Sequence, residues 1–293
     1  MKNFNVFAGA FVDRSGHRRH DPDWLARTLR SPNARFAPVW YDKCLVDGDP
    51  PGVALLPHAK VDPVLAPEES VFLGIFEGKP AFAFDIDCEK PPFPDNGQFH
   101  DLRYLGNVLP VEQANLVAHA IALINWHRLQ KFCGLCGEAT FAVSGGNTRR
   151  CSGKDCGEQI FPRVDPAIIV LVSHGEYCLL GRQASWPEGR YSTIAGFVEP
   201  GESLEDAVRR EVDEETNVDV DAVQYHSSQP WPFPSSLMLG FTAEATSRDI
   251  QLKDGELEDA QWFTRKELRS GFPKLPFRLS IARCLVDGWL DEH

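Results

Sequence analysis

The stretch GFVEPGESLEDAVRREVDEETNV, from Gly196 to Val218, decides the fold of this chain. Ser203 and Asp206 form a helix-capping pattern directly before an amphipathic run. We therefore predict a helix from about Leu204 to Thr216. Asn217, which tolerates the left-handed backbone conformation that ends many helices, follows it.

Three carboxylates share one face of this predicted helix. Glu211, Glu214 and Glu215 stand at positions i, i+3 and i+4, so their side chains are close neighbours that repel one another. The repulsion becomes a gain when divalent cations bind among them. Hard oxygen ligands suit Mg²⁺ or Mn²⁺, which can bridge phosphate oxygens and lower the pKa of a bound water. The structural alternative is a solvated acidic helix.

The spacing of the whole stretch carries a family resemblance. Gly196, Glu202, the run Arg210-Glu211-Val212 and the pair Glu214-Glu215 match the Nudix box, so the chain resembles the Nudix hydrolases. The resemblance implies an α/β (α+β) fold, the Nudix α/β/α sandwich with a mixed sheet. We expect it to be preceded by a β-rich N-terminal domain and a small zinc ribbon.

The same resemblance implies roles for individual residues. Glu211, Glu214, Glu215 and Arg210 form the catalytic set. Arg210 with Glu202 orients the helix, and Glu214 is a further ligand or the base. A distant acidic residue completes the family's metal site; in KDGELEDAQWF it corresponds to Glu256, with Glu258 and Asp259 as weaker alternatives. The implied ligands for Mg²⁺ or Mn²⁺ are the Ala195 carbonyl, Glu211, Glu214, Glu215 and Glu256.

A proline-rich segment from Ser228 to Ser236, SQPWPFPSS, is predicted to determine which substrate the chain binds. Its three prolines make a stiff loop around two aromatic rings, which suits base stacking, although such rings can also plug into a core. The motif SQPWPFPxS after a Nudix box resembles the NADH pyrophosphatases. This resemblance implies a substrate-binding set of Arg103, Phe161, Phe197, Gln229, Pro230, Trp231, Pro232, Phe233, Pro234, Ser235, Ser236 and Ala282.

Four of the eight cysteines fall within a short segment. Cys133, Cys136, Cys151 and Cys156 have metal-ligand spacing, and four sulfur ligands predict a closed, structural Zn²⁺ site with no open position for water. A rival hypothesis is a nucleic-acid-binding zinc ribbon attached to an inactive hydrolase domain. Its basic residues would be Arg149, Arg150 and Lys154.

Composition limits the class of protein. The formal net charge of −12 argues against nonspecific coating of nucleic acid. No stretch reaches the roughly 18 uncharged apolar residues of a membrane helix, so we expect no membrane association. The run from Phe4 to Val12 is expected to be a buried strand rather than a signal peptide. Zinc thiolates and unpaired cysteines fit a reducing compartment, and the cytoplasm is the expected location.

The chain is predicted to have four parts. These are a β-rich domain at 1–108, with a hairpin turning at Glu77-Gly78-Lys79, a connecting helix at 109–131, a zinc ribbon at 132–160 and a catalytic domain at 161–293. No repeat of fixed period is visible, although the two β-rich halves could be diverged copies of one fold.

The predicted reaction is metal-dependent hydrolysis of the diphosphate bond of NADH or NAD⁺ to nicotinamide mononucleotide and AMP. NAD caps on RNA contain the same bond and are a possible substrate. ADP-ribose and dinucleoside polyphosphates are the alternatives within the enzyme class. By resemblance, the protein is expected to be a homodimer.

Overall fold

The computed structural model describes residues 5–253 and 255–292, which divide into two compact units. The C-terminal unit contains Asp165–Pro230 and Ser236–His293, together with the first residues up to Val6. The N-terminal unit contains Phe7–Val164 and, from the proline-rich loop, Trp231–Ser235.

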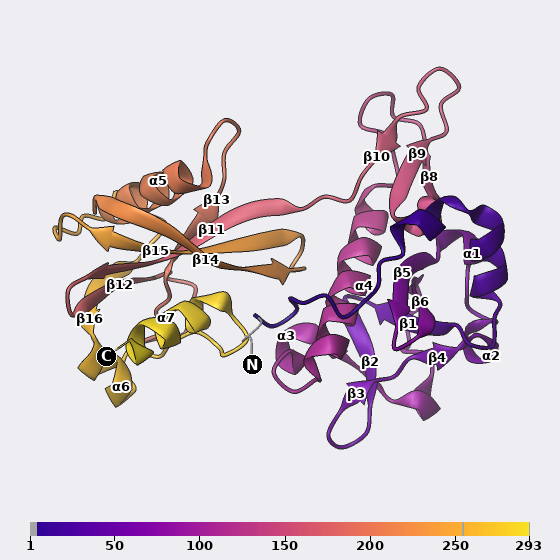
Figure 1. Ribbon diagram of the computed structural model, residues 1–293, viewed down its shortest axis with the longest axis horizontal. Helices are drawn as coiled ribbons and strands as arrows, with labels where there is room; N and C mark the ends of the chain where they lie inside the picture. Colours follow the sequence, from indigo (N-terminus) through magenta and orange to yellow (C-terminus); the bar gives the residue numbers. More distant parts are fainter. Residues whose placement is uncertain (1–4, 254, 293) are drawn as a thin grey trace. The chain divides into compact units, whose positions relative to one another are not determined.

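The C-terminal unit is a mixed sheet between helices. Its strands run in the order β14-β15-β11-β12-β16, β13 pairs with β11, and β11 is parallel to β15. Helices α5 and α7 lie on opposite faces (Figure 1). The element bounds are β11 Asp165–His174, β12 Tyr177–Arg182, β13 Ile194–Phe197, α5 Leu204–Thr216, β14 Val220–Trp231, β15 Ser236–Ala245, β16 Asp259–Thr264, α6 Arg265–Ser270 and α7 Ile281–Asp291.

The two faces of β11 explain this layering. Successive side chains of a strand point to opposite faces. Ile168 and Val170 pack in the cluster with Val208 of α5, whereas Ile169 and Leu171 pack in the cluster with the residues of α7. The strand is apolar and buried from Ala167 to Val172 because both of its faces are covered there. This is the α/β/α sandwich that the sequence predicted.

The N-terminal unit contains a second mixed sheet and a small cysteine-bearing subdomain. Its larger sheet has the order β3-β2-β1-β6-β5, with β4 on β1 and β7 on β2. The bounds are η1 Gly16–His20, α1 Pro22–Leu29, β1 Arg35–Trp40, β2 Lys43–Asp47, β3 Gly52–Val53, β4 Leu56–Pro57, α2 His58–Val61, η2 Pro67–Glu69, β5 Val71–Phe76, β6 Lys79–Ile86, η3 Pro94–Asn96, β7 Gln98–Asp101, α3 Leu102–Leu105, α4 Val111–Leu129, β8 Thr140–Val143, η4 Ser144–Gly146, β9 Thr148–Cys151 and β10 Gln159–Ile160.

The two large sheets have the same connectivity. In each, the first strand (β1 or β11) is parallel to a later strand (β6 or β15) and antiparallel to the strand that follows it (β2 or β12). Strands β4, β5 and β7 take the places of β13, β14 and β16. Helices α3 and α4 follow β7 as α6 and α7 follow β16. The main difference lies between β4 and β5, where the four-residue α2 stands in the place of the 13-residue α5.

The predicted elements agree with the structure where the local signals are strong. The helix from Leu204 to Thr216 has the bounds expected, and the turn at Glu77-Gly78 joins β5 to β6. The expected strand near the N-terminus is wrong for its described part: Asn5 to Val12 is not a strand, and Phe7 is buried with a left-handed φ of 71°. None of the described helices combines the length and apolar character that crossing a membrane requires.

A buried polar network joins the cysteine-bearing hairpin β8–β9 to the end of α4. Arg149, only 4% exposed, donates to the Thr140 hydroxyl at 2.8 Å and carbonyl at 2.8 Å, and to His127 Nδ1 at 3.0 Å. Because Nδ1 accepts from a guanidinium, His127 Nε2 carries the proton and donates to the Gly146 carbonyl at 2.7 Å. Burial lowers the pKa of His127, which keeps the ring neutral in this network.

Replacing Arg149 with Leu should therefore destabilise the N-terminal unit. The substitution leaves buried acceptors on Thr140 and His127 without a donor, and we expect a loss of about 3 kcal/mol in the free energy of unfolding. Urea unfolding at neutral pH measures it. The matched control is Arg150→Leu at the exposed neighbouring position, expected within about 0.5 kcal/mol of the parent. Equal effects of the two substitutions would contradict this account.

Candidate active site and cysteine cluster

Local signals at both ends of α5 fix the helix that carries the predicted carboxylates. At the start, Ser203 Oγ accepts from the Asp206 backbone N–H at 3.2 Å, and the Ser203 hydroxyl lies 2.6 Å from the Asp206 carboxylate. At the end, Asn217 takes the left-handed conformation, with φ of 61°, and its N–H donates to the Asp213 carbonyl at 2.7 Å. This is the helix stop expected from the sequence.

Glu211 packs directly on the glycine that opens the box. A Cβ atom placed on Gly196 would lie 1.9 Å from Glu211 Cδ, so no larger residue fits there without displacing the carboxylate. Gly196 lies in β13, where it pairs with Ile168 of β11. Only glycine lets the sheet and the carboxylate approach this closely.

Arg210 neutralises part of the acidic face. Its Nε donates to Glu202 at 2.6 Å, and its Nη1 donates to Glu211 and Glu214, both at 2.9 Å. Its Nη2 reaches the Phe197 carbonyl at 2.9 Å, which ties the helix to β13. These bonds with Arg210 lower the pKa of Glu202 to about 2. One cation thus holds together three carboxylates that would otherwise repel one another.

The carboxylates differ in their surroundings. Burial raises the pKa of Glu211, and the nearby charges of Glu214 and Glu256 raise it further, against the lowering effect of Arg210. Glu215 is only 4% exposed. Buried carboxylates under mutual repulsion gain stability when a cation compensates their charge, so this donor set of hard oxygens fits a divalent ion such as Mg²⁺ or Mn²⁺.

The three acidic candidates from the C-terminal loop lie in different environments. Glu256 is the one whose charge acts on Glu211. Glu258 forms a close ion pair with Arg182, and the Asp259 carboxylate accepts from the Tyr191 hydroxyl and from Gln261 Nε2. The side chains of Glu258 and Asp259 are therefore already engaged by neighbours.

Gln229, at the start of the proline-rich loop, is fully buried. Its amide N–H₂ donates to the carbonyls of Val6 at 3.0 Å and Leu279 at 2.8 Å, and its oxygen accepts from the Ile281 N–H at 2.9 Å. A substrate could contact this side chain only if these bonds broke. In this structure Gln229 holds the N-terminal end of α7 in place, where Ala282 is also buried. No local pattern in the sequence indicates that Val6 and Gln229 meet.

The rings of the loop pack within the N-terminal unit. Trp231 and Phe233 meet edge to face with centroids 5.1 Å apart, and both contact the buried Phe7. The Arg103 guanidinium lies 5.7 Å from the Phe233 centroid and is held by Asp101 at 2.5 Å. The structure therefore brings together three predicted substrate-binding residues, Arg103, Trp231 and Phe233.

The other predicted substrate-binding residues vary in exposure. Phe161 in the N-terminal unit and Phe197 in the C-terminal unit expose large aromatic surfaces, 66% and 59% of their area. Such exposed rings are available for stacking. Among the remaining loop residues, Pro232 is buried, Pro234 is exposed, and an intermediate exposure is shared by Pro230, Ser235 and Ser236.

The four predicted zinc ligands lie together and can hold a metal ion. Among the described residues they form the one group of three or more candidate ligands whose donor atoms all lie within 4.8 Å of one another: Cys133, Cys136, Cys151 and Cys156. The structure also explains the wider spacing of the second pair. Gly137 N–H donates to the Cys133 carbonyl, and Gly157 N–H donates to the Gly153 carbonyl. In the second turn, Gly153 therefore stands at the position that Cys133 has in the first. The first sulfur of the second cysteine pair comes from Cys151 instead.

The predicted basic surface of the ribbon is smaller than the sequence suggested. Arg149 was a candidate for nucleic-acid contact, but its guanidinium is buried and fully engaged in the network with Thr140 and His127. Arg150 and Lys154 are exposed.

Comparison with known proteins identifies the family. The protein-family model described as "NUDIX domain" matches residues 162–283, and the family model described as "NADH pyrophosphatase-like rudimentary NUDIX domain" matches residues 33–126. The chain belongs to the Nudix hydrolase family, in the group that carries this rudimentary second domain.

Its relatives include proteins named NAD-capped RNA hydrolase NudC. That of Stutzerimonas stutzeri is 42% identical over 218 residues, covering 74% of this chain and 76% of the relative. That of Deinococcus radiodurans is 43% identical over 228 residues, covering 76% and 78%. The human relative named NAD-capped RNA hydrolase NUDT12 is 44% identical over 197 residues, covering 62% of this chain. The match spans only 43% of the human protein's length.

Adding a methyl group at Gly196 should weaken divalent-cation binding. Gly196→Ala displaces the Glu211 carboxylate, and disturbing the groups that orient a metal ligand typically costs about 10- to 100-fold in affinity. Titration of Mn²⁺ followed by electron paramagnetic resonance measures the change. Gly288→Ala in α7 is the control, because nothing lies within 4 Å of its added Cβ. An unchanged Mn²⁺ affinity in Gly196→Ala would exclude Glu211 from the cation site.

Proposed function

We propose that this chain hydrolyses the diphosphate bond of NADH or NAD⁺, releasing nicotinamide mononucleotide and AMP, and that it also removes NAD caps from RNA. The observation that carries the proposal is the Glu211 carboxylate held on Gly196, on the same helix as the buried Glu215. The names of the two bacterial relatives, which share over 40% identity with most of this chain, support the choice of substrate.

In this proposal the carboxylate face of α5 binds the catalytic cation. Glu211, Glu214, Glu215 and Glu256, together with the Ala195 carbonyl, would hold Mg²⁺ or Mn²⁺. Such an ion neutralises phosphate charge and makes water more acidic. Arg210 acts on the protein side: it fixes Glu211 and Glu214 and, through the Phe197 carbonyl, keeps the helix at β13. Glu202 anchors Arg210.

Aromatic and cationic residues would recognise the dinucleotide. We assign stacking to the exposed Phe197 and Phe161 and to the loop rings Trp231 and Phe233, because every base presents a flat face to an aromatic ring. Arg103, held beside Phe233, supplies a cation for phosphate. The backbones of Pro230, Pro232, Pro234, Ser235, Ser236 and Ala282 complete the proposed set. Gln229 acts as a positioning residue, since its side chain is used internally.

The reaction is tested with NADH, Mn²⁺ and ¹⁸O-labelled water, with products identified by mass spectrometry. Wild type should release AMP and reduced nicotinamide mononucleotide, with the label showing which phosphorus is attacked. Glu215→Gln should lower the rate about 100-fold or more, because a ligand of the charge-stabilising cation is lost. Glu205→Gln, an exposed change in the first turn of the same helix, should leave the rate within about twofold.

The other outcomes separate the alternatives. Cleavage of ADP-ribose with intact NADH would keep the hydrolase and overturn its substrate. Absence of cleavage of any nucleoside diphosphate derivative with either metal would overturn the activity itself.

We further propose that the four-cysteine cluster holds a structural Zn²⁺, since four sulfur ligands close a tetrahedral site. The ribbon would then be residues 132–160, between a connecting helix at 109–131 and a catalytic domain at 161–293, with a degenerate Nudix-like domain at 1–108. The rudimentary domain match over residues 33–126 supports the last of these assignments. Cytoplasmic location and a homodimer complete the proposal. The location rests on the free cysteines, which fit a reducing compartment. The homodimer rests on analogy with the family.

Loss of one cluster sulfur should release the zinc. Cys156→Ser is expected to purify with well under one zinc per chain, by plasma mass spectrometry, and to melt at a lower temperature, because metal binding contributes folding free energy. Cys88→Ser is the control, as Cys88 lies outside the cluster. A zinc content unaffected by Cys156→Ser would show that the metal is held elsewhere.

A further inference from the structure

The N-terminal unit has a cavity on the sheet face that corresponds to the catalytic face of the other unit. In the C-terminal unit, α5 covers the face formed by Ile168 and Phe241. In the matching topology of the N-terminal unit, that face carries Phe36 and Phe82, which pack with Val61 of the short α2. With only four residues, α2 cannot cover the face that α5 covers with 13.

Two other elements cover the face incompletely. Helix α1 packs Leu25 and Leu29 against it, and the η4 loop approaches closely enough that a Cβ on Gly145 would lie 3.1 Å from Phe72 Cβ. Between them remains a cavity of about 820 Å³. Ligand pockets typically measure about 300 to 1,000 Å³, so this cavity has room for a small organic molecule.

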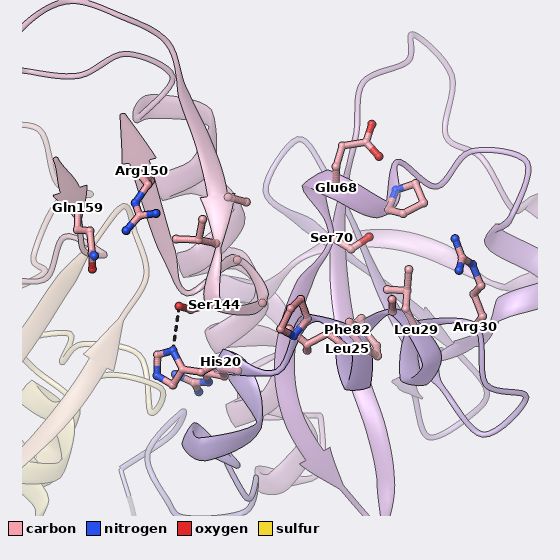
Figure 2. A pocket seen from close by; sticks show the side chains of 18 residues that line it. His20, Leu25, Leu29, Arg30, Glu68, Ser70, Phe82, Ser144, Arg150 and Gln159 are labelled. Atoms are coloured by element: carbon pink, nitrogen blue, oxygen red, sulfur yellow. Dashed lines mark hydrogen bonds between the residues drawn. The ribbon is translucent and has the colours of Figure 1, made fainter. Parts of the chain in front are cut away.

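The walls of the cavity divide into an apolar floor and a basic rim. Figure 2 shows Leu25, Leu29 and Phe82 between Arg30 toward one end and Arg150 toward the other. Arg19 also lines the cavity, and His20 is held there by Ser144 at 3.3 Å. Glu68 is the one acidic residue among the lining residues. The rim is therefore cationic in a chain whose net charge is −12.

The three arginines of the rim are Arg19, Arg30 and Arg150. Within residues 5–253 and 255–292, no carboxylate forms an ion pair with any of them. The Arg19 Nε is buried without a hydrogen-bond acceptor, and burial lowers the pKa of its guanidinium. A desolvated cation without a partner is costly, and an incoming anion would offset that cost.

We propose that this cavity binds a nucleoside phosphate. Guanidinium groups recognise phosphate by charge-assisted hydrogen bonds. The accessible part of the floor, Leu25 and Ala26 beside the buried Phe82, accepts the apolar face of a base. Ser70 and Gln159 add polar groups at the wall for the edges of a base or sugar. The ligand is either a free mononucleotide or one nucleotide of an RNA chain, and both present the same chemistry. The lining residues all belong to the N-terminal unit, and none of them is part of the proposed hydrolytic site.

Photocrosslinking to the full chain tests the site and distinguishes the two sources. The probes are 8-azidoadenosine 5′-monophosphate and a short uncapped oligoribonucleotide containing 4-thiouridine, and labelled peptides are mapped by mass spectrometry. Label is expected in peptides from 22–30 or 143–150. Arg30→Ala and Arg150→Ala should each reduce labelling at a subsaturating probe concentration by about tenfold, the loss typical of one charged hydrogen bond.

Two further variants make the result decisive. Arg27→Ala removes an exposed charge from the same helix without lining the cavity and should leave labelling unchanged. Ala26→Trp should block labelling by filling the cavity without changing its charge, and thermal melting verifies that each variant folds. If the mononucleotide labels the site and the variants reduce this labelling, the ligand is a free nucleotide. If only the oligoribonucleotide labels the site, the ligand is RNA. No label in these peptides, or label that survives Arg30→Ala, Arg150→Ala and Ala26→Trp, overturns the proposal.

Discussion

The contact between Gly196 and the Glu211 carboxylate is the constraint on which the candidate active site depends. The carboxylate occupies the space where any other residue at position 196 would place its Cβ. Strand β13 and helix α5 can approach this closely only because one of them lacks a side chain at the crossing point. The approach buries Glu211, and the burial raises its pKa. The missing side chain at Gly196 therefore explains both the close approach of β13 and α5 and the raised pKa of Glu211.

Arg210 offsets part of the free-energy cost of burying Glu211. Three glutamates at helical spacing repel, and a buried carboxylate without a partner would cost several kcal/mol. Arg210 gives hydrogen bonds to Glu202, Glu211 and Glu214, and to a backbone carbonyl of β13, so one side chain joins the helix to the sheet and compensates part of its charge. The compensation is incomplete, since several carboxylates share one cation. That surplus of negative charge is the physical reason why this face favours divalent ions.

The sequence predicted most where the signal is local. The start of α5 at Ser203 and its stop at Asn217 are encoded within a few residues, so the helix has the predicted bounds. The sequence predicted less where the partners are distant. Gln229 belongs to a motif that suggests substrate contact, yet its bonds to Val6 and Ile281 join residues about 220 and 50 positions away. Arg149 was grouped with surface cations because its burial depends on His127, 22 positions earlier. Pairings of this kind leave no periodic pattern, so only the folded chain reveals them.

The two units share one connectivity, but different elements cover the equivalent face of each sheet. In the C-terminal unit the connection between β13 and β14 contains a full helix, which packs on the sheet and carries the carboxylates of the candidate site, with Glu211 against β13. In the N-terminal unit the corresponding connection holds only α2, so that unit lacks a helix long enough to carry such a carboxylate face. The apolar sheet beneath still requires cover, because exposed phenylalanines would cost free energy. Helix α1 and the η4 loop supply this cover from other parts of the chain. Arginines line the cavity beside them, Arg19 in η1, Arg30 directly after α1 and Arg150 in β9, where α5 carries glutamates in the other unit. The sign of the charge over the two equivalent faces is therefore opposite, which suits a cation at one face and an anion at the other.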